Sequence, residues 1–214
     1  MSYIIDAVTK VTLKDLFDEA KEVYDSIWEQ ARGEGIDPKI YLHWTAGRYG
    51  QFWSPYHIQI DKDGSIYRND LLDLDDVSEG TWLRNTGSIS VTALCGFDTT
   101  TNFSGTNPLT ADQLESLATV TNVLADALDL TIDIKHVLTH GEAADNEDGW
   151  EAHEEYGPKT DCERWDLEVL WLDKSQVFDP WDEGNRGGDV IRGKANWYRQ
   201  TYGVGGIANG VKLA

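Results

Sequence analysis

Two histidines stand where short apolar strands are expected to end. His43 closes the run 39–43, and His140 closes the run 132–140. A third segment, residues 159–167 (KTDCERWDL), follows the second histidine and carries acids and a cysteine. Two imidazoles with one carboxylate or thiolate are the protein ligands of a catalytic Zn²⁺, which keeps a fourth position for water. The sequence therefore predicts a zinc site built from both histidines and one residue of the third segment.

Composition limits the partners of such a site. The chain has 214 residues, a formal net charge of −20 and 40% hydrophobic residues, which suits one folded domain. Its few basic residues form no cluster, so we expect no nucleic acid partner. No apolar run approaches the roughly 18 residues that cross a bilayer, so we expect no membrane insertion. The first residues lack a basic and an apolar region, so we expect synthesis in the cytoplasm without a signal peptide. We also expect a monomer.

The first half of the chain predicts one long helix and most of a sheet. Apolar residues recur at helical spacing from Thr12 to Arg32, and Thr12 with Asp15 forms a capping pair. Alternating patterns predict a strand over Lys39–Trp44, a hairpin over Tyr56–Arg68 about an Asp-Lys-Asp-Gly turn, and a strand over Ser88–Leu94. Cys95, at the end of an apolar run, is expected to be a buried small hydrophobe.

The second half predicts further helices around the same sheet. Thr110 and Gln113 form a capping box before a long amphipathic helix. We expect a strand over Ile132–Thr139, a long acidic loop over Gly141–Cys162, a short helix over Trp165–Leu172, and little regular structure over 173–214. The fold class is thus α/β, with a mixed central β-sheet flanked by helices. We expect residues 1–172 to form one zinc-binding domain and residues 173–214 a loop-rich C-terminal extension packed on it.

Several segments taken together resemble a known family. They are His43-Trp-Thr-Ala-Gly, Tyr56 to Ile66, Asn85-Thr-Gly-Ser-Ile, the helix from Thr110, Leu138-Thr-His140, and residues 159–167, in that order. This ordered set resembles the zinc-dependent N-acetylmuramoyl-L-alanine amidases of the type-2 amidase, peptidoglycan recognition protein and phage T7 lysozyme group. The resemblance covers roughly residues 39–172.

The resemblance implies a zinc site of two histidines and a Cys or Asp. His43 and His140 take the histidine positions directly. The third ligand has three candidates, Asp161, Cys162 and Asp166. Phage-type relatives with a long loop after the second histidine tend to read Arg-or-Lys, Trp, Asp here, so we prefer Asp166. Asp166 would otherwise be an acid at the start of a helix.

The resemblance also implies two residues that assist catalysis. Tyr56 takes the position of the family tyrosine, and Arg164 replaces a lysine two residues before the third ligand. Arginine stays charged, so Arg164 would stabilise an oxyanion without relaying a proton. Many members place a glutamate where this chain has Thr92, which cannot act as a base. Glu142 is either an acceptor that fixes the tautomer of His140 or a solvent-facing acid.

The implied activity is hydrolysis of the amide between N-acetylmuramic acid and L-alanine in bacterial peptidoglycan. We expect an endolysin of phage type, which acts on the cell wall after release. The alternative is a recognition module that binds peptidoglycan without cutting it. Trp44 and Trp53 are the expected sugar-stacking residues, and Trp82 and Trp150 lie in loops near the same motifs.

Overall fold

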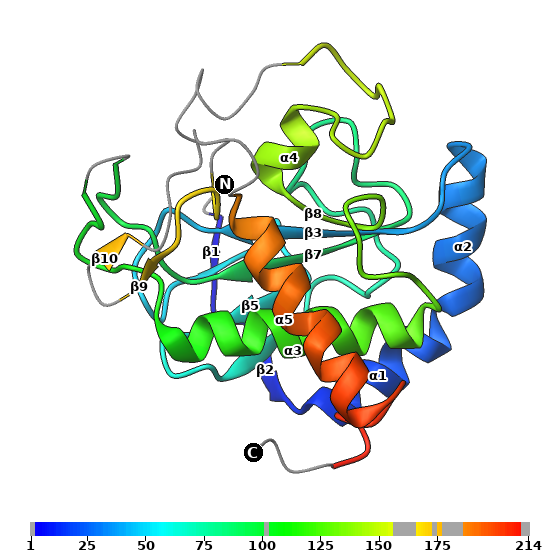
Figure 1. Cartoon of the computed structure of the whole chain (residues 1–214), viewed down its shortest axis with the longest axis horizontal. Coiled ribbons are helices and arrows are strands. Elements are labelled where there is room, and N and C mark those ends of the chain that lie inside the picture. The colour runs from blue at the N-terminus through cyan, green and yellow to red at the C-terminus, as the bar shows by residue number, and fades with distance from the viewer. Residues whose placement is uncertain (1–2, 101–102, 156–165, 173–174, 177–185, 211–214) are drawn as a thin grey trace.

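The computed structural model of the chain describes residues 3–100, 103–155, 166–172, 175–176 and 186–210. Its elements, labelled in Figure 1, are β1 (Ile4–Ile5), β2 (Val8–Val11), α1 (Leu13–Glu22), α2 (Tyr24–Gly33), β3 (Lys39–Trp44), β4 (Phe52–Trp53), β5 (Ile58–Ile60), β6 (Ile66–Asn69), β7 (Ser88–Ala93), α3 (Ala111–Ala127), β8 (Val137–Thr139), α4 (His140–Ala144), β9 (Trp171–Leu172), β10 (Ser175–Gln176) and α5 (Gly187–Tyr202).

A six-stranded mixed sheet organises the molecule. Its strand order is β2-β6-β5-β7-β3-β8. The pairs β5–β7, β7–β3 and β3–β8 are parallel, whereas β5–β6 and β6–β2 are antiparallel. The parallel strands are buried along their whole length, as expected for strands covered on both faces. The mixed α/β class predicted from the sequence is therefore confirmed.

One face of this sheet carries the main core. Helix α3 lies against β3, β5 and β7, and α1 and α5 pack on α3 (Figure 1). Ile40, Leu42 and Trp44 of β3 belong to this core. Successive side chains of a strand point to opposite faces, so Tyr41 and His43 point to the other face. Tyr41 there packs in a small separate cluster with Leu138 and Ala143.

Local sequence signals account for several of these elements. Thr12 with Asp15 and Thr110 with Gln113 both form complete capping boxes, which confirms the predicted helix starts. The predicted hairpin is confirmed as β5 and β6, with Gly64 at φ 76° in its turn. Cys95 is fully buried in the core, as predicted.

Four predicted elements differ in the structure, besides the acidic loop expected over Gly141–Cys162, whose first residues belong to helix α4. The helix expected over Thr12–Arg32 is two helices, α1 and α2, which break at Val23 although no glycine or proline stands there. The strand expected over Ile132–Thr139 begins only at Val137, because the preceding residues form turns. Within Trp165–Leu172, the described residues form a turn followed by β9, and no helix.

The fourth difference lies in the C-terminal segment. We expected little regular structure over 173–214, and the chain there forms the 16-residue helix α5. Ile191, Ala195 and Tyr198 of α5 are buried in the main core. None of the described helices combines the length and apolar character needed to cross a membrane.

Candidate metal centre

His43 lies near the carboxyl end of β3, a fully buried strand with a neighbour on each side. Strand β3 is hydrogen-bonded in parallel to β7 on one side and β8 on the other. His43 is fully buried on the face opposite α3. A side chain on a central strand has little freedom to move, so the sheet presents this imidazole rigidly.

His140 is delivered to the same edge by the neighbouring strand. Leu42 pairs with Thr139, so the residues that follow each of them are neighbours. His140 is the first residue of α4, and Thr139 caps that helix in a capping box with Glu142. The His43 and His140 rings have centroids 5.0 Å apart and meet edge to face.

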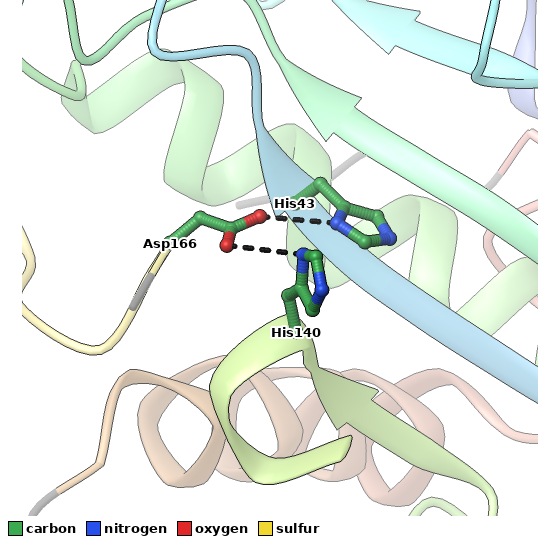
Figure 2. Close-up of side chains that lie close together, drawn as sticks. All are labelled: His43, His140 and Asp166. Atoms are coloured by element: carbon green, nitrogen blue, oxygen red, sulfur yellow. Dashed lines mark hydrogen bonds and ion pairs between the residues drawn. The ribbon is translucent and has the colours of Figure 1, made fainter. Parts of the chain in front are cut away.

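Asp166 faces both imidazoles from one side, as Figure 2 shows. Its Oδ2 is 3.0 Å from Nδ1 of His43, and its Oδ1 is 3.3 Å from Nδ1 of His140. The three groups come from β3, from the start of α4 and from the turn before β9. The ligand atoms that they offer all lie within 4.8 Å of one another.

The charges of these groups suit a cation. Burial opposes ionisation of Asp166, but the adjacent imidazoles outweigh it and lower the pKa of the carboxyl to about 2. Burial also lowers the pKa of His43, against the opposing effect of Asp166. The carboxylate is therefore ionised and the His43 imidazole neutral at neutral pH. Metal binding needs these protonation states.

The chemistry of this donor set fits a zinc ion. The Oδ1 atom of Asp166 is buried, and within the described part of the chain it makes no well-formed hydrogen bond beyond its 3.3 Å approach to His140. Such an atom is costly unless another partner satisfies it, and a cation held with two imidazole nitrogens would do so. Ligand atoms about 2.1 Å from a tetrahedral ion are about 3.4 Å apart, and each Nδ1 lies within that distance of one carboxylate oxygen, His43 of Oδ2 at 3.0 Å and His140 of Oδ1 at 3.3 Å.

The far side of His43 is enclosed by the segment that includes Gly80 and Thr81. Thr81 is buried, and its Oγ1 lies 3.2 Å from Nε2 of His43. A side chain added at Gly80 would meet both His43 and Tyr56 at 3.3 Å. The Tyr56 ring lies 5.2 Å from the His43 ring, centroid to centroid, so the structure brings Tyr56 beside the candidate ligands.

Thr92 and Glu142 complete the surroundings. Thr92 is the register partner of His43 on β7, is fully buried, and its Oγ1 has no hydrogen-bond partner among the described residues. Both interpretations of Glu142 were wrong, because its carboxylate is buried and binds Arg192 and the Thr139 N–H.

Three other candidates, Asp161, Cys162 and Arg164, lie outside the described residues.

The tryptophans differ in what they can contact. Trp44 is only 5% exposed and packs in the main core, so the sugar-stacking role expected for it is wrong. Trp53 is partly buried in β4. Arg84 lies over the Trp150 ring at 4.8 Å from its centroid. Trp82, which follows Thr81, is 62% exposed and presents the most open ring of the four.

Sequence reasoning missed two polar residues around the candidate ligands. Thr81 sits in the segment before Ser88, and nothing in its spacing marks a contact with a histidine 38 residues away. Glu168 is fully buried two residues after Asp166 and accepts a hydrogen bond from Thr139. Its position two residues after the candidate ligand Asp166 was the one feature of the sequence that could have pointed to it. Burial raises the pKa of Glu168 to about 7, against the opposing effect of Arg186.

The solved structures that resemble this chain do so weakly and over half of its length. No protein-family model matches the chain, and no curated protein matches it. Two solved structures from Clostridium intestinale URNW resemble part of it, the endolysin N-acetylmuramoyl-L-alanine amidase LysCS and the N-acetylmuramoyl-L-alanine amidase LysC. Each is 20% identical with a TM-score of 0.38, and the alignments cover 50% of this chain and 72% and 73% of theirs.

Proposed function

We propose that this chain is a zinc-dependent amidase that cleaves the bond between N-acetylmuramic acid and L-alanine in bacterial peptidoglycan. The observation that carries the proposal is the convergence of His43, His140 and Asp166 on one another at one edge of the sheet. The ordered motifs of the sequence, which resemble those of zinc amidases, supply the reaction and the substrate.

The ligand assignment follows from which atoms face each other. Nδ1 of His43 and Nδ1 of His140 both point at the Asp166 carboxylate, so these nitrogens and one carboxylate oxygen would hold the ion (Figure 2). Coordination through Nδ1 leaves the proton of a neutral imidazole on Nε2. Thr81 Oγ1 lies where it can accept that proton from His43 in a hydrogen bond.

A bound Zn²⁺ would act as a Lewis acid and would activate water near neutral pH. The reaction adds water to the lactyl carbonyl carbon and breaks its bond to the alanine nitrogen, which leaves as an amine. Negative charge develops on the carbonyl oxygen. We assign to Tyr56 the stabilisation of that charge by a hydrogen bond from its hydroxyl, because its ring lies next to His43. Arg164 remains a second candidate for this role.

The buried sheet beside the ligands offers no general base. Thr92, paired with His43 on β7, has a hydroxyl that does not ionise in the working pH range. The proton of the attacking water must therefore pass to another group at the site or to solvent. Glycan contact is assigned to Trp82, whose exposed ring follows Thr81, and to Trp53.

Zinc analysis and peptidoglycan digestion test this proposal together. Purified chain should contain about one zinc per molecule, and it should release stem peptides with a free N-terminal alanine from purified sacculi. His43→Ala, His140→Ala and Asp166→Ala should lose both properties. His136→Ala is the matched control, because His136 directly precedes β8 whereas His140 directly follows it.

The outcomes separate the candidate functions. Zinc and cleavage that depend on the three residues support the amidase. Zinc binding and sacculus binding without release of peptide would instead support the recognition module. Unchanged zinc content in the double variant His43→Ala, His140→Ala would refute the proposed site.

A further inference from the structure

A single buried acid joins the two segments that bring His140 and Asp166 together. Glu168 follows Asp166 by two residues, and its side chain is fully buried. Its Oε1 accepts a hydrogen bond from Oγ1 of Thr139 at 2.9 Å. Thr139 immediately precedes His140. The position of one candidate ligand is thus tied to that of the other through one carboxylate.

An arginine at the start of α5 connects the same two segments a second time. Nε of Arg186 donates to Oε2 of Glu168 at 2.8 Å, and Nη2 lies 3.1 Å from Oε1. The same guanidinium donates to Asp145 and to Glu147, each at 3.0 Å. Asp145 and Glu147 follow directly on α4, the helix that begins with His140. One planar group therefore spans the Asp166 segment and the His140 helix.

Two glycines permit this close approach. A side chain at Gly141 would overlap the Glu168 carboxylate, and a side chain at Gly187 would overlap the backbone carbonyl of Leu167. Leu167 itself has a left-handed backbone, with φ 61°, and is fully buried. A residue other than glycine keeps such a conformation only where its surroundings hold it. The segment next to Asp166 is therefore fixed by packing against α4 and α5.

A second ion pair holds α5 against the end of β8. Both Nη atoms of Arg192 donate to the Glu142 carboxylate, at 2.7 and 2.8 Å. Arg192 also donates to the carbonyl of Val137. Glu142 in turn accepts the N–H of Thr139. Helix α5 and its first turn thus contact residues that precede and follow His140 in the chain, Val137 and Glu142 through Arg192, and Asp145 and Glu147 through Arg186.

We propose that Arg186 and Glu168 are positioning residues of the candidate zinc site, and that α5 sets the affinity of the site for the metal. This inference rests on the proposed function, because it takes zinc as the ligand. His140 and Asp166 come from separate segments, and any freedom between them must be lost when an ion binds both. Groups that fix them beforehand remove that cost and raise the affinity.

Zinc affinity of the full-length chain tests the proposal. Metal-free protein is titrated with zinc in competition with a chromophoric chelator, and its melting temperature is measured separately. Arg186→Ala and Glu168→Gln should weaken zinc binding by about ten- to hundredfold, the range found for groups that orient metal ligands. Arg186→Lys restores a charge beside Glu168 without the planar fork, so its affinity should lie between those of Arg186→Ala and the unmodified chain.

Arg199→Ala is the matched control. Arg199 lies on the same helix and pairs at 2.7 Å with Asp126 of α3, whose side chain is fully buried. Its loss should lower the melting temperature and leave zinc affinity unchanged. If Arg186 has only a structural role, Arg186→Ala should show the same pattern, a lower melting temperature with unchanged zinc affinity. That result would overturn the inference.

The remaining outcomes are also decisive. If Arg186→Ala does not fold, Glu168→Gln and Arg186→Lys provide the comparison, and affinity equal to that of the unmodified chain in both overturns the inference. That result leaves the proposed zinc site intact. Failure of the unmodified chain to bind zinc would instead overturn the proposed function, and the inference with it.

Discussion

Replacing His57 should remove a specific part of the pH dependence of stability. His57 follows Tyr56 and is fully buried. Its Nδ1 accepts the N–H of Ser90 at 3.0 Å, and its Nε2 lies 2.9 Å from the carbonyl of Asp76, to which it donates. Both ring nitrogens are therefore satisfied in the neutral form, and a second proton on Nδ1 would displace the Ser90 N–H and leave only the Ser90 hydroxyl, 3.0 Å away, to accept it.

The size of the effect follows from the pKa. Burial lowers the pKa of His57 to about 4 from 6.5, and the Asp76 carbonyl only partly offsets this. Between these values the unfolded chain binds a proton that the folded chain does not, so stability falls as pH falls from 6.5 to 4. A difference of about 2.5 pKa units corresponds to about 3 kcal/mol, fully present above pH 6.5.

Denaturant unfolding of metal-free protein measures this contribution. The free energy of unfolding of the unmodified chain and of His57→Gln is compared at several pH values between 7.5 and 4. Other groups titrate equally in both, so the difference between the two proteins isolates His57. That difference should change by about 3 kcal/mol, with the unmodified chain losing more stability on acidification.

Parallel curves for the two proteins would refute this reasoning. Direct NMR titration of the imidazole in the unmodified chain gives an independent check. His57 should remain neutral until the pH approaches 4, and a protonated ring at pH 6 would contradict the assignment even if the variant failed to fold.

Further predictions concern zinc and substrate. Asp166→Ala should weaken zinc binding in a chelator competition by more than about a hundredfold. Asp166→Cys should keep zinc binding, because a thiolate also binds zinc. Equal loss of zinc binding in both variants would count against Asp166 as a ligand. Thr81→Val should weaken zinc binding about tenfold, because it removes the hydrogen-bond acceptor at Nε2 of His43. Thr81→Ser keeps a hydroxyl and should not weaken zinc binding. Equal zinc affinities of Thr81→Val and the unmodified chain would show that this hydroxyl has no effect on the imidazole. Added salt, from about 10 to 150 mM, should speed digestion of walls rich in teichoic acid, because the net charge of −20 is then screened, and leave the rate on small uncharged fragments unchanged. A flat or falling rate on such walls would contradict that expectation.

Sequence patterns predicted those structural elements whose determinants lie close together in the chain. The capping boxes at Thr12 and Thr110 and the hairpin turn before Gly64 each depend on residues a few positions apart. The proximity of His43 and His140 was predictable for a related reason. Both lie at or next to the ends of predicted strands, and neighbouring strands that run parallel end at the same edge of a sheet.

Contacts between distant segments were not predictable in this way. Helix α5 contains Gly187, Gly188 and Gly193, and glycine has a low helix propensity, so its sequence resembles a loop. Tertiary packing requires glycine at position 187, because the backbone there approaches Leu167 too closely for a side chain. The α4 cap was a missed local signal, since Thr139 and Glu142 have the spacing of a capping box.

X-ray anomalous scattering from zinc-loaded crystals tests the central claim most directly. Data recorded on either side of the zinc absorption edge locate the ion without reference to the ligands. We expect one peak about 2.0–2.2 Å from Nδ1 of His43, Nδ1 of His140 and a carboxylate oxygen of Asp166. A peak bound by Asp161 or Cys162 in place of Asp166 would contradict the ligand assignment, and the lack of any peak at both histidines would contradict the zinc site itself.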